Sequence, residues 1–294
     1  HGIYCTTQTV GQSLAKFTMR DCYIQQGAGY AFYHINNSTN NENGGLAMAN
    51  ISNNVMYGGI KLENSGDSIV ISNNKLGGTG TGVWAALTSG ASELTISDNN
   101  ITTSISAIVI TKGMRVNILR NNIEHIVAGA RSNAVVDIDP PSPATTIYDY
   151  YVSGVIQQNL VSIFGSSDAT TCVKIRGARG TLIQDNTFLS GLSGRTAIDV
   201  SATCSDVRIG GNAFNAGIST RISDSGVGTM GVAKTLTLQN SWVQQTAAEP
   251  PTVSKDLSGN VVIEGSIKNG TTTPGTILFQ LPVGFRPATT KVIR

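Results

Sequence analysis

Three aspartates in the middle and second half of the chain, Asp137, Asp139 and Asp199, are candidates for acid–base chemistry. Hydrolysis of a glycosidic bond uses two carboxyl groups, about 5–5.5 Å apart for retention of configuration or about 6.5–9.5 Å apart for inversion. Outward positions on neighbouring strands lie about 5 Å apart, so residues one or two strands apart can supply either spacing. We therefore expect these aspartates to form a catalytic group.

Two cations, Lys174 and Arg176, alternate with the aspartates. They can hold uronate or phosphate groups of a substrate, or act as base and charge clamp in a lyase. The alternative interpretation is a surface ladder of opposite charges, in which each cross-strand pair contributes only about 0.2–1 kcal/mol. The sequence leaves both interpretations open.

Aromatic residues near these charges are candidates for sugar binding, because their rings offer flat apolar faces. Trp84 is expected to point outward from a neighbouring strand. A long insertion, of a kind that is often functional, follows Asp139. It contains three prolines and then Tyr148, Asp149, Tyr150 and Tyr151. The tyrosines either bind substrate or cover the core or a seam between subunits.

A repeat predicts the elements that position these side chains. The pattern apolar-x-apolar-x-x-Asn-x-apolar recurs clearly at residues 69–76, 94–101, 116–123 and 207–214. Looser copies bring the total to eight, and their Asn positions are 54, 74, 99, 121, 159, 186 and 212, with Cys22 in the first copy. Such a variable period indicates stacked coils whose loops absorb insertions. The asparagines are expected to tolerate a left-handed turn and to hydrogen-bond from coil to coil.

A second strand follows each Asn, at residues 59–62, 83–86, 107–110, 134–138, 172–175 and 197–200. Alternation places its apolar residues inward and leaves two outward rows. The first outward row is Lys61, Trp84, Val109, Asp137, Lys174 and Asp199, and the second is Glu63, Ala86, Thr111, Asp139, Arg176 and Ser201. On the other predicted sheet the outward row is bland, as expected of a face that packs against another subunit: Thr18, Asn50, Val70, Thr95, Asn117, Val155, Leu182 and Arg208.

These patterns predict an all-β protein with a right-handed parallel β-helix over residues 1–225. Proline is absent from 1–139 and 144–249, as interior parallel strands require. A Gly-rich linker is expected at 226–234. A small antiparallel, sandwich-like module is expected at 235–294, with strands at 235–238, 260–267 and 276–281. Both ends begin or stop within strand-like runs, so we expect a piece of a longer protein.

The composition restricts the classes of function. Of the 294 residues only 13% are charged and the formal net charge is +2, which gives no reason to expect binding to nucleic acid or to an anionic membrane. No stretch approaches a transmembrane length, so insertion into a membrane is not expected. The four cysteines form no CxxC pair or Cys/His cluster, so structural zinc is not expected. The sequence also has no phosphate loop and no calcium motif, so no cofactor or other metal is expected. Reduced core thiols are favoured, with a Cys5–Cys22 bridge as the alternative.

The repeat resembles that of the pectate-lyase-like β-helix superfamily. The segments 260–276 (NVVIEGSIKNGTTTPGT) and 281–287 (LPVGFRP) resemble the C-terminal module of bacteriophage tail fibres and tailspikes, with a Gly-x-x-x-x-Gly-Thr stretch followed by Leu-Pro-x-Gly-aromatic-Arg-Pro. This resemblance implies a homotrimer in the virion tail, made in the host cytoplasm, that binds and often cuts bacterial surface polysaccharide. It transfers no catalytic residue.

The sequence thus favours a polysaccharide depolymerase, with hydrolysis preferred over elimination. Asp137, Asp139 and Asp199 would be catalytic. Sugar-binding residues would be Trp84, Lys174, Arg176 and the Tyr148, Asp149, Tyr150 and Tyr151 loop. Two other classes remain: a non-catalytic receptor-binding or structural tail protein, and a secreted pectate-lyase-like enzyme.

Overall fold

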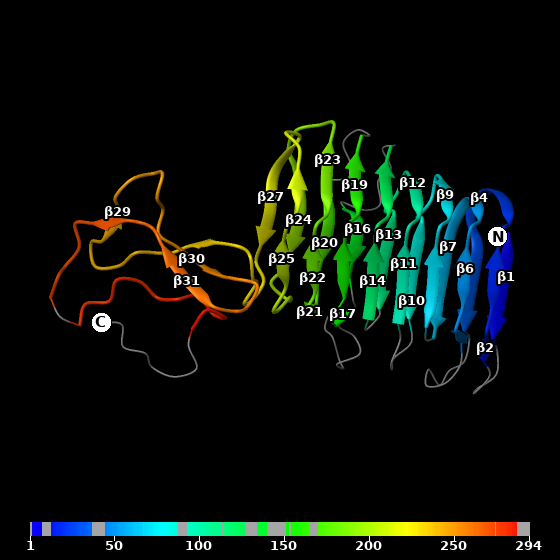
Figure 1. Ribbon diagram of the computed structural model, residues 1–294, viewed down its shortest axis with the longest axis horizontal. Helices are drawn as coiled ribbons and strands as arrows, with labels where there is room; N and C mark the ends of the chain where they lie inside the picture. Colours follow the sequence, from blue (N-terminus) through cyan, green and yellow to red (C-terminus); the bar gives the residue numbers. More distant parts are fainter. Residues whose placement is uncertain are drawn as a thin grey trace.

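The computed structural model describes residues 2–7, 13–36, 45–66, 68–87, 93–112, 115–126, 134–139, 151–152, 154–164, 170–273 and 275–286. In this part of the chain all regular secondary structure is β, without a helix. Parallel strands stack from the N-terminal end of the molecule, and the small antiparallel sheets follow beyond the last coil (Figure 1). The predicted fold class, a parallel β-helix followed by a small antiparallel unit, is confirmed.

The first face of the β-helix is an eight-stranded parallel sheet. Its strands are β3 (Thr18–Arg20), β6 (Asn50–Ser52), β8 (Ile69–Ser72), β11 (Glu93–Ser97), β14 (Arg115–Leu119), β18 (Val155–Gln157), β22 (Leu182–Gln184) and β25 (Arg208–Gly210). The pairing joins the whole predicted bland row in register, from Thr18 to Arg208.

A second face, which the sequence did not predict, follows directly after the ladder asparagines. Its strands are β9 (Lys75–Gly78), β12 (Asn100–Thr103), β15 (Asn122–His125), β19 (Leu160–Ile163), β23 (Thr187–Ser190), β26 (Ala213–Phe214) and the first parts of β4 (Tyr23–Asn36) and β7 (Val55–Ser65). These strands are short, and β9 buries only Leu76. A single inward apolar residue gives no alternation to read.

The third face contains the predicted second strands. It comprises β1 (Ile3–Thr7), the later parts of β4 and β7, then β10 (Val83–Leu87), β13 (Ile108–Lys112), β16 (Ala134–Ile138), β20 (Thr171–Ile175), β24 (Arg195–Val200) and β27 (Ile218–Asp224). Because β4 and β7 run through both faces, the second and third faces form one 15-stranded sheet. The predicted inward residues are buried, with at most 1% of any side chain exposed, and they form a continuous core.

Two short parallel pairs lie outside these faces. They are β2 (Ser13–Ala15) with β5 (Gly45–Ala47), and β17 (Tyr151–Val152) with β21 (Ala178–Arg179).

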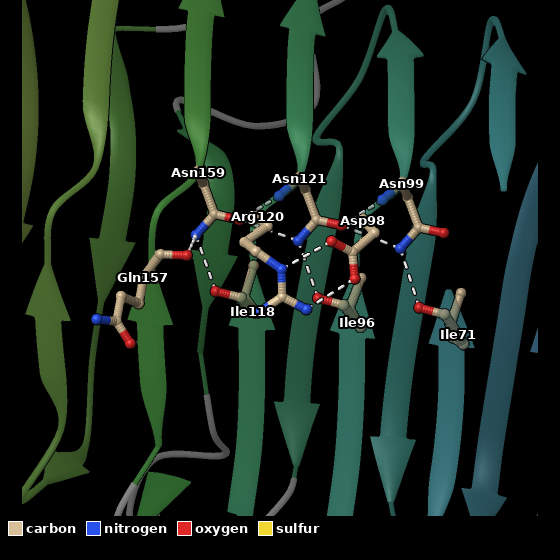
Figure 2. A network of polar contacts seen from close by, with 9 residues as sticks. All are labelled: Ile71, Ile96, Asp98, Asn99, Ile118, Arg120, Asn121, Gln157 and Asn159. Atoms are coloured by element: carbon tan, nitrogen blue, oxygen red, sulfur yellow. Dashed lines mark hydrogen bonds and ion pairs between the residues drawn. The ribbon is translucent and has the colours of Figure 1, made fainter. Parts of the chain in front are cut away.

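The asparagine ladder forms as predicted and links successive coils (Figure 2). The Asn99 side-chain oxygen accepts bonds from the backbone N–H and the side-chain amide of Asn74, at 2.9 and 3.0 Å. The Asn99 amide donates to the Ile71 carbonyl at 3.0 Å and to Asn121 Oδ1 at 3.0 Å. The same bonds recur along the ladder to Asn212, and Cys22 takes the first position through its backbone N–H.

The left-handed turn lies one residue earlier than predicted. The residue before the ladder asparagine has positive φ in each coil, for example 58° at Asp98 and 52° at Arg120. The asparagine itself serves only the ladder. Asp98 and Arg120 also form an ion pair across the turn, with Nε 2.8 Å from Oδ1 (Figure 2).

Residues after the last coil stay attached to the β-helix. Val227 and Met230 continue the parallel pairing with Ser205 and Arg208. At this end Lys234 Nζ lies 3.0 Å from the Asp224 carboxylate, whose side chain is only 3% exposed. The proposed domain boundaries at 225 and 235 stay a prediction.

The antiparallel unit differs in detail from the prediction. Its strands are β28 (Lys234–Thr235), β29 (Val243–Gln244), β30 (Thr252–Lys255), β31 (Val261–Glu264) and β32 (Ile267–Lys268). Strand β30 was missed, and the strand predicted at 276–281 is reduced to one bridge between Leu238 and Phe279. The unit has a small core of its own around Leu236, Val253 and Phe285.

We predict that Asn99→Ala lowers the free energy of unfolding by about 3 kcal/mol or more, because it leaves the buried Asn74 N–H without its partner and removes the side-chain bonds to the Ile71 carbonyl and Asn121. Urea unfolding measures the loss. The control is Asn212→Ala at the end of the ladder, where the residue is partly exposed and water can replace the amide; it should cost about half as much or less. Equal losses in the two variants would contradict the prediction.

Burial gives the imidazole of His34 a pH-dependent role in stability. Desolvation lowers its pKa from 6.5 to about 4. Its neutral form therefore contributes stability that is complete above the unfolded pKa and is lost as pH falls from about 6.5 to 4, by about 3 kcal/mol. In the variant His34→Leu this component should vanish. Urea unfolding at both pH values measures it, and identical pH dependence in the two proteins would refute the assignment.

Candidate functional site

The first predicted outward row exists on the third face. In the register Lys61 pairs with Trp84, Trp84 with Val109 and Val109 with Asp137. Asp137 then pairs with Lys174, and Lys174 with Asp199. All six side chains are partly exposed while their strand neighbours face the core. The structure therefore aligns Trp84 and the candidate charged residues along one face.

The second row departs from the prediction at one point. A register shift between Ala85 and Ala86 pairs Ala86 with Lys112 instead of Thr111. Beyond this shift, Asp139 and Arg176 are adjacent as predicted. The Asp139 backbone N–H donates to the Ile110 carbonyl of the preceding coil, and the Arg176 backbone N–H donates to the Ile138 carbonyl of the preceding coil, each at 2.9 Å. Apolar alternation does not predict a bulge of this kind, because the inward residues before the shift, such as Ala85 and Ile110, still pair as expected.

Asp137 and Asp139 share one cation. Arg176 Nη2 lies 2.6 Å from Asp137 Oδ1, and Arg176 Nε lies 2.7 Å from Asp139 Oδ1. The Asp137 side chain is 17% exposed and the Asp139 side chain 48%. Asp199 lies on the far side of Lys174, whose Nζ is 3.8 Å away. The three aspartates thus lie in one charged cluster, with a cation beside each of them.

The Asp137 carboxyl has a perturbed pKa. Burial, the largest effect, raises the pKa. The positive charge of Arg176 lowers it, and the negative charge of Asp139 raises it again. Lys174 also lowers it, but the net effect is a pKa raised above the ordinary value of an aspartate. A carboxyl that holds its proton more tightly than usual is suited to act as a general acid.

An aromatic cluster occupies the other end of the row. Lys61 Nζ lies 4.7 Å from the ring centroid of Tyr33, 4.9 Å from that of Trp84 and 5.8 Å from that of Tyr30. It also bonds Glu63 Oε2 at 2.9 Å, and the Tyr33 hydroxyl donates to the same oxygen at 2.5 Å. The sequence prediction missed Tyr30 and Tyr33, because it assigned no second strand to the first coil, where Cys22 takes the place of the ladder asparagine before β4. Extending the register from Lys61 to the preceding strand reaches Tyr33.

A cleft of about 360 Å³ joins the two clusters on the third face. Its wall includes the aromatic residues Tyr30 and Trp84, and Val109 lines it between Trp84 and Asp137. Thr81 and Ser106, from the turns that precede β10 and β13, also line it. The cleft crosses the strands, so a ligand within it contacts successive coils.

The tyrosine loop cannot be assigned to this cleft. Tyr148, Asp149 and Tyr150 lie outside the described residues. Tyr151 begins β17, where its backbone pairs with Ala178. The prediction that these four residues bind sugar stays a prediction.

The cysteines and the other possible metal ligands of the described residues do not form a further site. Cys5, Cys22, Cys172 and Cys204 are free thiols, so the Cys5–Cys22 bridge is not formed. The described part of the chain holds no group of three or more His, Cys, Asp or Glu side chains placed to bind a metal ion. It also contains no helix long and apolar enough to cross a membrane.

The class of protein that the fold defines is the parallel β-helix, and it is consistent with the pectate-lyase-like type. Comparison with protein-family models, with curated proteins and with solved structures finds no match to this chain.

We predict that Arg176→Gln raises the pKa of Asp137. Burial and the negative charge of Asp139 both raise this pKa, and the substitution removes the positive charge that opposes them. Lys174→Gln is the matched control and should raise the same pKa less, since Lys174 makes a smaller contribution. Carboxyl-carbon NMR titration of protein labelled at aspartate measures both shifts. A pKa of Asp137 that is unchanged in Arg176→Gln would show that the guanidinium does not control it.

Proposed function

We propose that this chain is a tailspike-type protein that binds a bacterial surface polysaccharide in the third-face cleft and cleaves it there. The observation that carries the proposal is the cleft itself, which joins the rings of Tyr30 and Trp84 to the Asp137 carboxyl. Aromatic faces bind sugar rings, and a carboxyl with a raised pKa is the group that protonates a glycosidic oxygen. The β-helix fold is compatible with proteins that bind or depolymerise polysaccharide.

The proposed reaction is hydrolysis. Asp137 donates its proton to the glycosidic oxygen as the bond from that oxygen to the anomeric carbon breaks. A second carboxylate removes a proton from the water that adds to the anomeric carbon. Asp139 lies two residues further along the chain, so the backbone positions of the two aspartates are about 6.6 Å apart at the rise of a strand, a spacing compatible with the carboxyl separation for inversion. Asp199, two coils away, lies at about 9.6 Å, close to the upper limit.

The tailspike assignment rests on the resemblance of segments 260–276 and 281–287 to tail-fibre modules. It includes a homotrimer and a place in the virion tail, outside the host cell. The edge strand β31 supports subunit contact, because Val261, Val262 and Ile263 are each 37–41% exposed there. Apolar residues exposed together on an edge strand are typical of a surface that another chain covers. The same C-terminal motifs favour this assignment over a secreted pectate-lyase-like enzyme.

One observation favours a second candidate, a non-catalytic receptor-binding protein. Arg176 binds both Asp137 and Asp139, so each carboxylate already has a charged partner. In such a protein the charges would only hold the shape of a glycan-binding cleft.

We predict that Asp137→Asn lowers the rate of polysaccharide cleavage by about 10²–10⁴-fold, the usual contribution of a general acid, and leaves binding nearly unchanged. The assay measures new reducing ends, and absorbance of unsaturated uronate separates elimination from hydrolysis. The control Asp185→Asn makes the same change in the turn next to the ladder, where Asn also tolerates the positive φ of 55°, and should be fully active. Full activity of Asp137→Asn would exclude this residue as the acid, and binding without any product in the parent protein would establish the non-catalytic candidate.

A further inference from the structure

Three cations on the cleft face already have carboxylate partners. The outward rows hold three cations whose side chains are described, Lys61, Lys174 and Arg176. Each has its nitrogen atoms 2.6–3.8 Å from a carboxylate of the same face. None of these three is therefore left to bind an anionic group of a ligand without losing an existing partner.

Carboxylates outnumber these cations. The partners are Glu63, Asp137, Asp139 and Asp199, so these three cations meet four carboxyl groups, and the formal balance of these seven side chains is −1 when all four carboxyl groups are ionised. The excess lies at the Arg176 end, where one guanidinium holds two aspartates. A polyanionic chain laid along the cleft would meet repulsion there, and like charges brought close in an interface are strongly disfavoured.

Lys61 is the cation nearest to the aromatic wall, and it is the most completely enclosed. It lies over three rings and bonds Glu63, and the Tyr33 hydroxyl closes the cluster by donating to Glu63. Burial opposes ionisation of Glu63, but the bonds from Tyr33 and Lys61 outweigh it and lower the pKa of Glu63. The pair therefore stays ionised and mutually neutralised at neutral pH.

Outside Asp137, the surface that the cleft offers to a ligand carries no charge. Its lining outside Asp137 consists of the rings of Tyr30 and Trp84, the side chains of Val109 and Ile105, and short polar groups at turns. Ring faces and hydroxyl groups bind the C–H faces and hydroxyls of sugars without a charge.

We infer that the cleft accepts a neutral polysaccharide, and that the Lys61–Glu63 pair excludes uronate-bearing and phosphate-bearing chains. This inference rests on the proposed function and adds the substrate class to it. The sequence allowed Lys174 and Arg176 to bind uronate or phosphate groups of a substrate. In this inference they instead neutralise the aspartates of the cleft face.

The first experiment measures binding of the whole chain to immobilised capsular and O-polysaccharides, each typed as neutral or acidic, in about 25 and 500 mM NaCl, where screening differs strongly. We expect binding to neutral polysaccharides only, with affinities that agree within about twofold between the two salt concentrations. Salt-sensitive binding to acidic polysaccharides alone would overturn the substrate class and leave the proposed function standing. Binding to none of them would overturn the proposed function.

The second experiment uses the variant Glu63→Gln, which leaves Lys61 without its carboxylate, and polygalacturonate as the anionic probe. We expect affinity for polygalacturonate to rise about fivefold or more over the parent protein at low salt and the gain to disappear at high salt. Glu93→Gln, the same change on the first face, is the matched control and should gain nothing. Thermal unfolding confirms that the variants are folded. If Glu63→Gln gains no more than Glu93→Gln, the ion pair does not exclude anions and the inference fails.

Discussion

The hydrogen bonds of the buried asparagine ladder fix the register on which every other feature of the β-helix depends. Each ladder amide accepts from the preceding coil and donates to a backbone carbonyl, so its bonding capacity is matched at one register only. A slip by one residue would break these bonds and also turn the inward residues of a strand to solvent. The left-handed residue before each asparagine, such as Asp98, turns the chain from the first face to the second at the same height in each coil.

The cleft follows from this register together with two close backbone approaches. A Cβ atom on Gly59 would lie 1.9 Å from the Thr81 carbonyl oxygen, and one on Gly82 would lie 2.6 Å from that of Ala107. Only glycine allows the turns before β10 and β13 to pack this closely on the neighbouring coils. Val109 then stands between the larger Trp84 and the charged Asp137, so the outward row is lowest where the cleft lies.

The sequence predicted what depends on strict alternation: the two registers from Thr18 to Arg208 and from Lys61 to Asp199, and the ladder that aligns them. It could not predict the second face, since its strands are short and most of them, such as β9, bury at most one apolar residue. Nor could it predict the partners of the charged residues. Alternation shows that Arg176 faces outward, but which carboxylates it reaches depends on side-chain conformations that leave no pattern in the sequence. The Tyr30 and Tyr33 cluster was missed because no second strand was predicted in the first coil, where Cys22 takes the place of the ladder Asn.

The pairing of charges on the third face constrains both binding and chemistry. Arg176 reduces the repulsion between Asp137 and Asp139, and the same contact lowers the tendency of Asp137 to hold a proton. Burial acts in the opposite direction and prevails, so the carboxyl keeps a raised pKa beside a cation. A sugar that covered the cleft would exclude water from this cluster and strengthen both effects, because charges interact more strongly as the surroundings become less polar. A neutral sugar would do so without adding a charge of its own, and the balance among Asp137, Asp139 and Arg176 would then decide whether the bound chain is cut or only held.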